Sequence, residues 1–164
     1  MKIKLATAFS GIGAIEQAFI RLGIKHDIVF ACDNGEIMLK QSTEELKKEF
    51  KEGNITNPQT FIKTKYKETG KTNWMKKSYF ANYKISESKW HDDIRFIDGN
   101  KYFGKVDLFV GGSPCQSFSS VGFQGGLEDA RGTLFYEYAR LIDEIKPKVF
   151  IYENVRAVTS HDGG

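Results

Sequence analysis

Apolar residues alternate along the chain between short continuous runs and stretches with helical spacing. Residues 3–9 form a mostly apolar run closed by a glycine-containing turn, which predicts a buried strand. From about residue 14 to residue 22 the spacing becomes that of a helix with one apolar face, formed by Ile15, Ala18, Phe19 and Leu22. The stretch HDIVFACD predicts a second strand, and residues 37–50 predict a second helix. This alternation is typical of the opening of a parallel sheet.

The second half of the chain resumes the alternation after an interruption. Between about residues 51 and 89 the periodicity fails, and the turn-forming stretches EGNITNP and ETGKTN predict a partly disordered insertion of low definition. WHDDIRFID then predicts a short third strand and KVDLFVGG a fourth. GTLFYEYARLIDEI has the spacing of a helix, which ends at Lys146 and Pro147, and KVFIYENV predicts a fifth strand.

The predicted fold is therefore α/β, with the first five strands of a mostly parallel sheet and no helix after the fifth. Such an incomplete sheet should leave the apolar edge of the fifth strand exposed, which invites a second chain or aggregation.

The composition fits one folded domain. The 164 residues are 40% hydrophobic and 27% charged, which is ordinary for a globular protein. We expect no membrane association, because the first residues lack the apolar block of a signal peptide and no window approaches the roughly 20 apolar residues of a membrane helix. Cys32 and Cys115 lie far apart without CxxC spacing, so neither a disulfide framework nor a metal cluster is indicated. A reducing, cytoplasmic location is expected.

The net charge of +3 is unevenly distributed. Residues 42–91 contain eleven Lys, no Arg and six Glu, a balance of +5. One interpretation is a solvated surface insertion, which is the commoner origin of such a segment. The other is a phosphate-binding flap, because lysines interleaved with aromatic rings suit nucleic-acid backbones. The rings are Tyr66, Trp74, Tyr79, Phe80, Tyr83 and Trp90.

The first turn has features of a nucleoside-binding site. In FSGIGA, Gly11 and Gly13 permit a tight turn and close approach of a ligand to the backbone. A dinucleotide-binding turn has a third glycine where this chain has Glu16, and an acidic residue is unfavourable beside a pyrophosphate. The turn therefore favours a nucleoside ligand without phosphates over NAD. Asp33, about twenty residues further on, either accepts hydrogen bonds from both ribose hydroxyls or serves as a turn or helix-capping residue.

The stretch GGSPCQSFS presents a candidate nucleophile. Cys115 follows Pro114 directly after the fourth predicted strand. A free cysteine is commonly a small buried hydrophobe, but Pro114 fixes φ and the small neighbours leave room for an exposed thiol. Glu153 ends the fifth strand at the corresponding edge, where a carboxyl group can hold or deliver a proton. Asp93, in DDIRF, lies at the same edge or is an ordinary turn residue. A thiol and a carboxyl group at adjacent strand ends are better explained by catalysis than by packing.

Taken in order, FSGIG, Asp33, DDI, GGSPCQSFS, LEDARGTLF, ENV and SHDGG resemble the first motifs of the C5-cytosine-specific DNA methyltransferases. The resemblance covers nearly the whole chain except roughly residues 51–89, and PCQSFS, RGTLF and ENV in this order and spacing are highly specific. It implies a Rossmann-like, S-adenosylmethionine-dependent methyltransferase fold, of which residues 1–164 are the amino-terminal catalytic part. The Lys-rich insertion at about residues 51–89 has no counterpart in compact members of the family.

The resemblance implies a pocket for S-adenosylmethionine. Asp33 would bind the ribose, where the family commonly has Glu, and Asp93 and Ile94 would contact the adenine. The other cofactor-binding residues would be Phe9, Gly11, Ile12, Gly13, Pro114 and Leu134.

The resemblance also implies a reaction. A cytosine flipped out of double-stranded DNA would enter the pocket, where Cys115 attacks C6 while Glu153 holds the exocyclic amine and N3. C5 would then take the methyl group, and loss of the C5 proton would release Cys115. Asn154 would help to hold the turn at Pro114 and Cys115, and SSVGFQGGLEDARG would be the loop that closes over DNA.

Family members continue with an arginine-containing motif, a target-recognition domain and a final cofactor motif, none of which follows ENV in this sequence. We therefore expect the chain alone to be inactive and to need a carboxy-terminal portion or a partner polypeptide, in a restriction-modification context. Two alternatives stay open: methylation of RNA such as tRNA by the same chemistry, and a non-catalytic remnant or regulatory subunit. An NAD-dependent dehydrogenase is disfavoured by Glu16.

Overall fold

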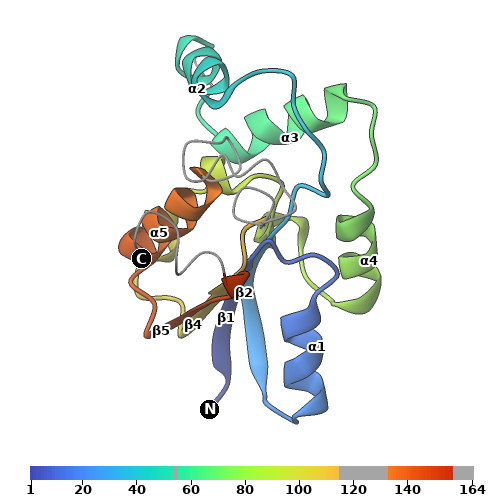
Figure 1. Ribbon diagram of the computed structural model, residues 1–164, viewed down its shortest axis with the longest axis vertical. Coiled ribbons are helices and arrows are strands. Elements are labelled where there is room, and N and C mark those ends of the chain that lie inside the picture. Colours follow the sequence, from blue (N-terminus) through green and yellow to red (C-terminus); the bar gives the residue numbers. More distant parts are fainter. Residues whose placement is uncertain (54, 115–132, 157–164) are drawn as a thin grey trace.

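The computed structural model describes residues 1–53, 55–114 and 133–156. Five strands form one sheet in the order β3-β2-β1-β4-β5, and every neighbouring pair is parallel (Figure 1). The strands are β1 (Ile3–Ala8), β2 (His26–Cys32), β3 (Trp90–His91), β4 (Leu108–Gly111) and β5 (Val149–Tyr152). The predicted α/β fold is confirmed. The order reverses between β1 and β4, and in parallel sheets ligands bind beyond the carboxyl ends at such a reversal.

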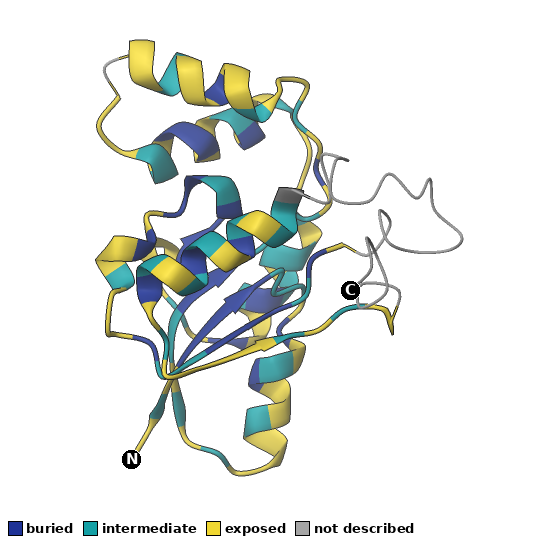
Figure 2. Ribbon diagram, turned by 60° about the vertical axis from the view of Figure 1, so that its left-hand side comes forward, coloured by how far each residue is buried: buried dark blue, intermediate teal, exposed yellow. Residues whose placement is uncertain are grey.

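Helices lie on both faces of the sheet and beyond its carboxyl ends (Figure 1). α1 (Ala14–Arg21) and α4 (Trp74–Asn82) lie on one side, and α5 (Thr133–Ile145) lies on the other. α2 (Thr43–Glu52) and α3 (Pro58–Glu68) lie beyond the ends of the strands. The strands between these layers are largely buried, as the dark blue ribbon in Figure 2 shows. The main apolar cluster joins the sheet to α5 and includes Phe30, Phe109, Tyr138, Leu141 and Ile145.

The second helix begins later than predicted. It starts at Thr43 and not at residue 37, because Ser42 and Glu45 form a reciprocal capping box there. Before it, Gly35 and Glu36 have φ values of 63° and 58°, which are incompatible with a helix. The Ser-x-x-Glu pattern is a signal for this boundary that the apolar spacing does not contain.

The prediction of a partly disordered segment at residues 51–89 is wrong. The segment contains α3 and α4, whose first turns are capped by the side chains of Asn57 and Asn73. α2 and α3 share an apolar cluster with the third strand region, formed by Ile37, Leu46, Phe61, Ile62, Tyr66 and Phe96. Lysines between the apolar positions weaken the helical periodicity, so the capping asparagines and Pro58 at the start of α3 are the better signals.

The aromatic part of the phosphate-binding hypothesis is also wrong. Tyr66, Tyr79, Tyr83 and Trp90 are at most 8% exposed, and the last three pack on Ala31 at the face of the sheet opposite α5. These rings form core and are not available to stack on bases. Of the other two rings, Phe80 is half-buried against the same cluster and Trp74 has 69% of its surface exposed.

The fifth strand lies at an edge of the sheet and exposes apolar side chains, as predicted. Val149, Phe150 and Ile151 are 50% to 55% exposed although they belong to a parallel strand, and β5 is yellow in Figure 2. Parallel strands are normally covered on both faces. In the part of the chain that the structure describes, no helix has the length and apolar character needed to cross a membrane.

Candidate functional site at the carboxyl ends of the strands

The turn after β1 is built from left-handed backbone. Phe9, Gly11 and Gly13 have φ values of 55°, 53° and 89°. Glycine adopts such values freely, whereas Phe9 is strained by on the order of 1 kcal/mol, a cost found most often at functional sites. Ser10 ties the turn to the end of β2, since its N–H donates to the carbonyl of Cys32 (3.0 Å) and its Oγ accepts from the Cys32 N–H (3.0 Å). The turn is therefore fixed at the carboxyl edge of the sheet.

Asp33 joins this turn to the next one. Its Oδ2 accepts from the N–H of Gly11 (2.8 Å) and its Oδ1 from the N–H of Gly35 (2.7 Å). Burial raises the pKa of Asp33, and the two hydrogen bonds oppose that shift. A carboxylate oxygen has two lone pairs, so each oxygen keeps the capacity to accept one more hydrogen bond. The turn-forming role is thus observed, and it leaves room for the predicted ribose contact, which stays a prediction.

Glu16 does not face the ligand side of the turn. Its side chain is fully buried, and its Oε1 accepts from Thr7 Oγ1 (2.9 Å) and from the Tyr79 hydroxyl (2.7 Å). The argument that Glu16 repels a pyrophosphate therefore loses its physical basis, because the carboxylate is directed at the protein interior.

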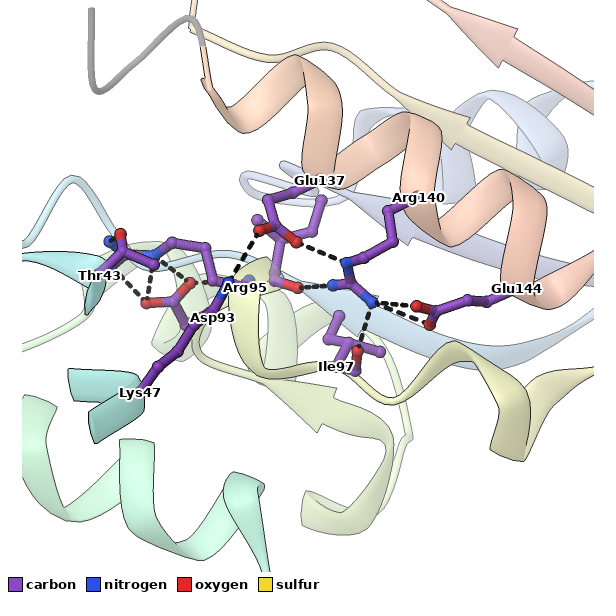
Figure 3. Close-up of polar contacts among 9 residues, drawn as sticks. Thr43, Lys47, Asp93, Arg95, Ile97, Glu137, Arg140 and Glu144 are labelled. Atoms are coloured by element: carbon purple, nitrogen blue, oxygen red, sulfur yellow. Dashed lines mark hydrogen bonds and ion pairs between the residues drawn. The ribbon is translucent and has the colours of Figure 1, made fainter. Parts of the chain in front are cut away.

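At the end of β3, Asp93 is bound within the protein. Its oxygens accept from the Tyr66 hydroxyl (2.9 Å), from Arg95 Nη2 (2.6 Å) and from the N–H of Arg95 (3.0 Å). Arg95 Nη1 in turn donates to Thr43 Oγ1 (2.8 Å), which connects this strand end to α2 (Figure 3). The structure gives Asp93 a role in holding the third strand end, and its predicted contact with adenine stays a prediction.

Arg140 of α5 holds the segment that follows Asp93. Its guanidinium donates to the carbonyls of Ile94 (3.1 Å) and Ile97 (3.0 Å) and pairs with Glu137 and Glu144 on its own helix (Figure 3). Ile94 belongs to the main apolar cluster, and Leu134 at the start of α5 packs against that cluster. Two residues predicted to touch the cofactor thus lie on the same side of the sheet.

The ends of β4 and β5 are in close contact. A Cβ on Gly112 would lie 2.7 Å from the carbonyl oxygen of Glu153 and 3.1 Å from its Oε2, so only glycine permits this approach. Asn154 Nδ2 donates to the carbonyl of Ser113 (3.0 Å) and to the hydroxyl of Tyr152 (2.7 Å). The exposed Glu153 therefore stands beside the backbone that leads to the cysteine turn.

Cys115 and the predicted closing loop lie outside the described residues. Pro114 is exposed at the end of the described segment. The other cysteine, Cys32, is buried, and burial, followed by the charges of nearby aspartates, raises the pKa of its thiol well above the usual value. Cys32 is therefore held as an unreactive thiol. Among the described residues, no three His, Cys, Asp or Glu side chains are grouped to hold a metal ion.

Comparison with known proteins identifies the chain's relatives. The family model described as C-5 cytosine-specific DNA methylase matches residues 66–164. The chain belongs to this family. The predicted resemblance is confirmed.

Named relatives come from phages and bacteria. Orphan methyltransferase M.Rho11sI of Bacillus phage rho11s is 32% identical over 163 residues, which are 99% of this chain and 25% of the phage protein. Type II methyltransferase M.PspPI of Psychrobacter sp. is 51% identical over 87 residues, 51% of this chain and 21% of that protein. The chain thus spans about a quarter of the length of the curated relatives that it matches.

A solved structure shows the same fold. The Dnmt2 methyltransferase of S. pombe superposes with a TM-score of 0.55 at 19% identity, over 94% of this chain and 37% of that chain. The Rossmann-like methyltransferase fold predicted from the sequence is confirmed.

Proposed function

We propose that the chain is part of an enzyme that methylates C5 of cytosine in double-stranded DNA. It would provide the turn at residues 9–13 that binds the cofactor, the nucleophile Cys115 and the carboxyl group of Glu153. The observation that carries the proposal is the convergence of four strand ends at one edge. The left-handed turn after β1, Asp33 after β2, the backbone leading to Cys115 after β4 and Glu153 after β5 all lie there.

The residues at the ends of β1 and β2 fit an adenosyl group. Asp33 keeps free lone pairs for ribose hydroxyls, and a Cβ on Gly11 would meet no atom within 4 Å, so the turn is open on that side. The other proposed lining residues are Phe9, Ile12, Gly13, Asp93, Ile94, Pro114 and Leu134. When bound, S-adenosylmethionine supplies an electrophilic methyl group.

The remaining chemistry belongs to the chain. The Cys115 thiolate adds to C6 of a flipped cytosine, forming an S–C6 bond and moving an electron pair towards C5. Glu153 holds N3 and the exocyclic amine, which favours charge at that ring nitrogen. Transfer of the methyl group to C5 would break its bond to the cofactor sulfur. The C5 proton would then leave to solvent, and its electron pair would restore the C5–C6 double bond and break the S–C6 bond, so that Cys115 is released as thiolate. Asn154 positions the cysteine turn through the carbonyl of Ser113.

We infer that sequence recognition requires further polypeptide, either a carboxy-terminal continuation or a partner chain, and that residues 1–164 alone are inactive. The chain spans about a quarter of its relatives, and the exposed side chains of β5 are of the kind that another element covers. The type II relatives support a restriction-modification role.

The test is methyl transfer by the assembly purified from its source. With labelled S-adenosylmethionine, we expect incorporation into cytosine-containing duplex DNA and not into tRNA. Cys115→Ala should reduce incorporation to background while duplex binding persists, because the nucleophile is lost but the DNA-binding surface is not. Transfer that persists in Cys115→Ala contradicts the mechanism, and transfer to tRNA alone replaces DNA by RNA as the substrate.

A further inference from the structure

Three side chains from residues 73–83 reach the candidate cofactor site from within the protein. Asn73 Nδ2 donates to the carbonyl of Asp33 (2.9 Å), and the Tyr79 hydroxyl donates to Glu16 Oε1 (2.7 Å). The Tyr83 hydroxyl donates to the carbonyl of Gly13 (2.6 Å). Asn73 caps the start of α4, Tyr79 lies within it, and Tyr83 follows its last residue. These three residues are called the α4 brace.

Tyr83 holds the last residue of the turn. Gly13 has a φ of 89° and precedes α1 without a side-chain cap. A Cβ on Gly13 would lie 2.2 Å from Cε2 of Tyr83, so the tyrosine ring occupies the space that a side chain would need. The carbonyl of Gly13 also accepts the first helical hydrogen bond, from the N–H of Gln17 (3.0 Å). Tyr83 therefore fixes both the left-handed residue and the start of the helix.

Tyr79 acts on the same turn through Glu16. The Glu16 carboxylate accepts from Thr7 before the turn and from Tyr79 on α4, so it joins the two sides of the turn to the helix behind it. Both hydroxyls are protonated donors near neutral pH, and burial, and next the charge of Glu16, raise their pKa values further. Glu16 Oε2 has no hydrogen-bond partner within the described residues.

Asn73 locks the start of α4 to the second turn. Its Oδ1 accepts from the N–H of Lys76 (2.8 Å), which caps α4, while its Nδ2 holds the carbonyl of Asp33. A Cβ on Gly35 would lie 2.4 Å from Asn73 Oδ1, so these two segments are in direct contact. Side chains at the two ends of one helix thus contact both turns that are proposed to bind the cofactor.

We propose that the α4 brace is a positioning element that preorganises the turn at residues 9–13 and Asp33 for the cofactor. The inference rests on the proposed function. A turn with three left-handed residues is ordered before the cofactor binds only if other contacts hold it. The α4 brace provides such contacts, so less conformational freedom is lost on binding. Cofactor affinity, and not the methyl-transfer step, should then depend on the brace.

The test is Tyr83→Phe, which removes one hydroxyl and keeps the ring. In the assembly purified from its source, we expect calorimetry to show S-adenosylmethionine bound about five- to tenfold more weakly, the order expected for one lost buried hydrogen bond. KM for the cofactor should rise by the same factor, and kcat at saturating cofactor should stay within about twofold.

Two further variants separate positioning from general stability. Tyr102→Phe is the matched control, because it loses a hydroxyl that lies 2.8 Å from His91 Nε2, away from the brace; cofactor affinity should not change. Asn73→Ser keeps a good helix cap but is too short to reach the Asp33 carbonyl, so it should weaken binding while the fold is retained.

The outcomes are distinguishable. Wild-type affinity in both Tyr83→Phe and Asn73→Ser overturns the brace and leaves the proposed function standing. Equal weakening in Tyr102→Phe also overturns it, because the effect is then one of general stability. A wild-type assembly that binds no S-adenosylmethionine refutes the proposed function itself and the brace with it.

Discussion

Several residues of this site are required for the backbone conformation or for close contact between two backbone segments, and not for their chemistry. Gly11 and Gly13 are required by positive φ, whereas Gly112 is required because its neighbour Glu153 leaves no room for a Cβ. Phe9 accepts a left-handed conformation that other side chains rarely adopt. Substituting any of these glycines therefore changes geometry before it changes chemistry.

Buried His91 makes stability depend on pH. Burial, and next the charge of Lys101, lower its pKa from 6.5 to about 4. As pH falls below 6.5 the unfolded chain takes up a proton that the folded protein does not, so the free energy of unfolding should drop by about 3 kcal/mol between pH 6.5 and pH 4. Urea unfolding at pH 6.5 and pH 4 measures this loss.

His91→Gln is the control for that measurement, because the glutamine amide can still hydrogen-bond to the hydroxyl of Tyr102 and does not titrate. The pKa values of Asp33 and Asp92 are raised by burial, so these carboxyls take up protons in the folded protein first and act in the opposite direction. Asp33 and Asp92 are present in the wild-type protein and in His91→Gln, so the difference between the two pH dependences of stability is due to His91. Identical pH slopes in the two proteins contradict the prediction.

At the scale of elements, the sequence predicts those parts of the fold that local pattern determines. Apolar runs identify β1, β2, β4 and β5, and helical spacing identifies α1 and α5. In the stretch predicted as the third strand only Trp90–His91 is a strand, and Ile94–Phe96 forms a 3-10 helix. It fails for α3 and α4, where lysines interrupt the apolar positions and the capping side chains mark the helices instead. Contacts between distant segments cannot be read in this way: Tyr83 and Gly13 are 70 residues apart, and no periodicity connects them.

The candidate site shows the same division. Motif order places Asp33 and Glu153 at the correct strand ends, because parallel strands bring their carboxyl ends to one edge. It does not show that Asp93 is bound by Arg95 and Tyr66, since that depends on how α3 packs against the third strand region.

Arg140 connects two elements, and its loss should weaken both. Arg140→Met removes the side-chain donor to the carbonyl of Ile97 and one of two donors to the carbonyl of Ile94, which also accepts from the N–H of Ile97 (3.3 Å). We expect the free energy of unfolding to fall by about 2 kcal/mol. Lys146→Met removes an exposed pair with Asp143 and should cost less than about 0.5 kcal/mol. Urea unfolding compares the two variants, and equal losses would show that the Arg140 contacts contribute no more than a surface pair.

The two edges of the sheet differ in how well they are covered by other elements. Near β3, the α2 and α3 pair and the α4 brace close the structure with their own apolar clusters. At the other edge, β5 exposes Val149, Phe150 and Ile151 beside the carboxyl end that carries Glu153. The proposed further polypeptide would act at this second edge, so the cofactor would lie on the β2 side of the nucleophile and the recognition element on the β5 side.

The central claim is that Cys115 forms a covalent bond to cytosine C6, and trapping that bond tests it most directly. Duplex DNA containing 5-fluorocytosine has no C5 proton to lose, so the bond should persist once the methyl group has been transferred. We expect a denaturation-stable complex, dependent on S-adenosylmethionine, whose adduct maps to Cys115 by mass spectrometry and is absent in Cys115→Ser. An assembly that methylates DNA without forming this adduct, or that forms it at another residue, contradicts the account.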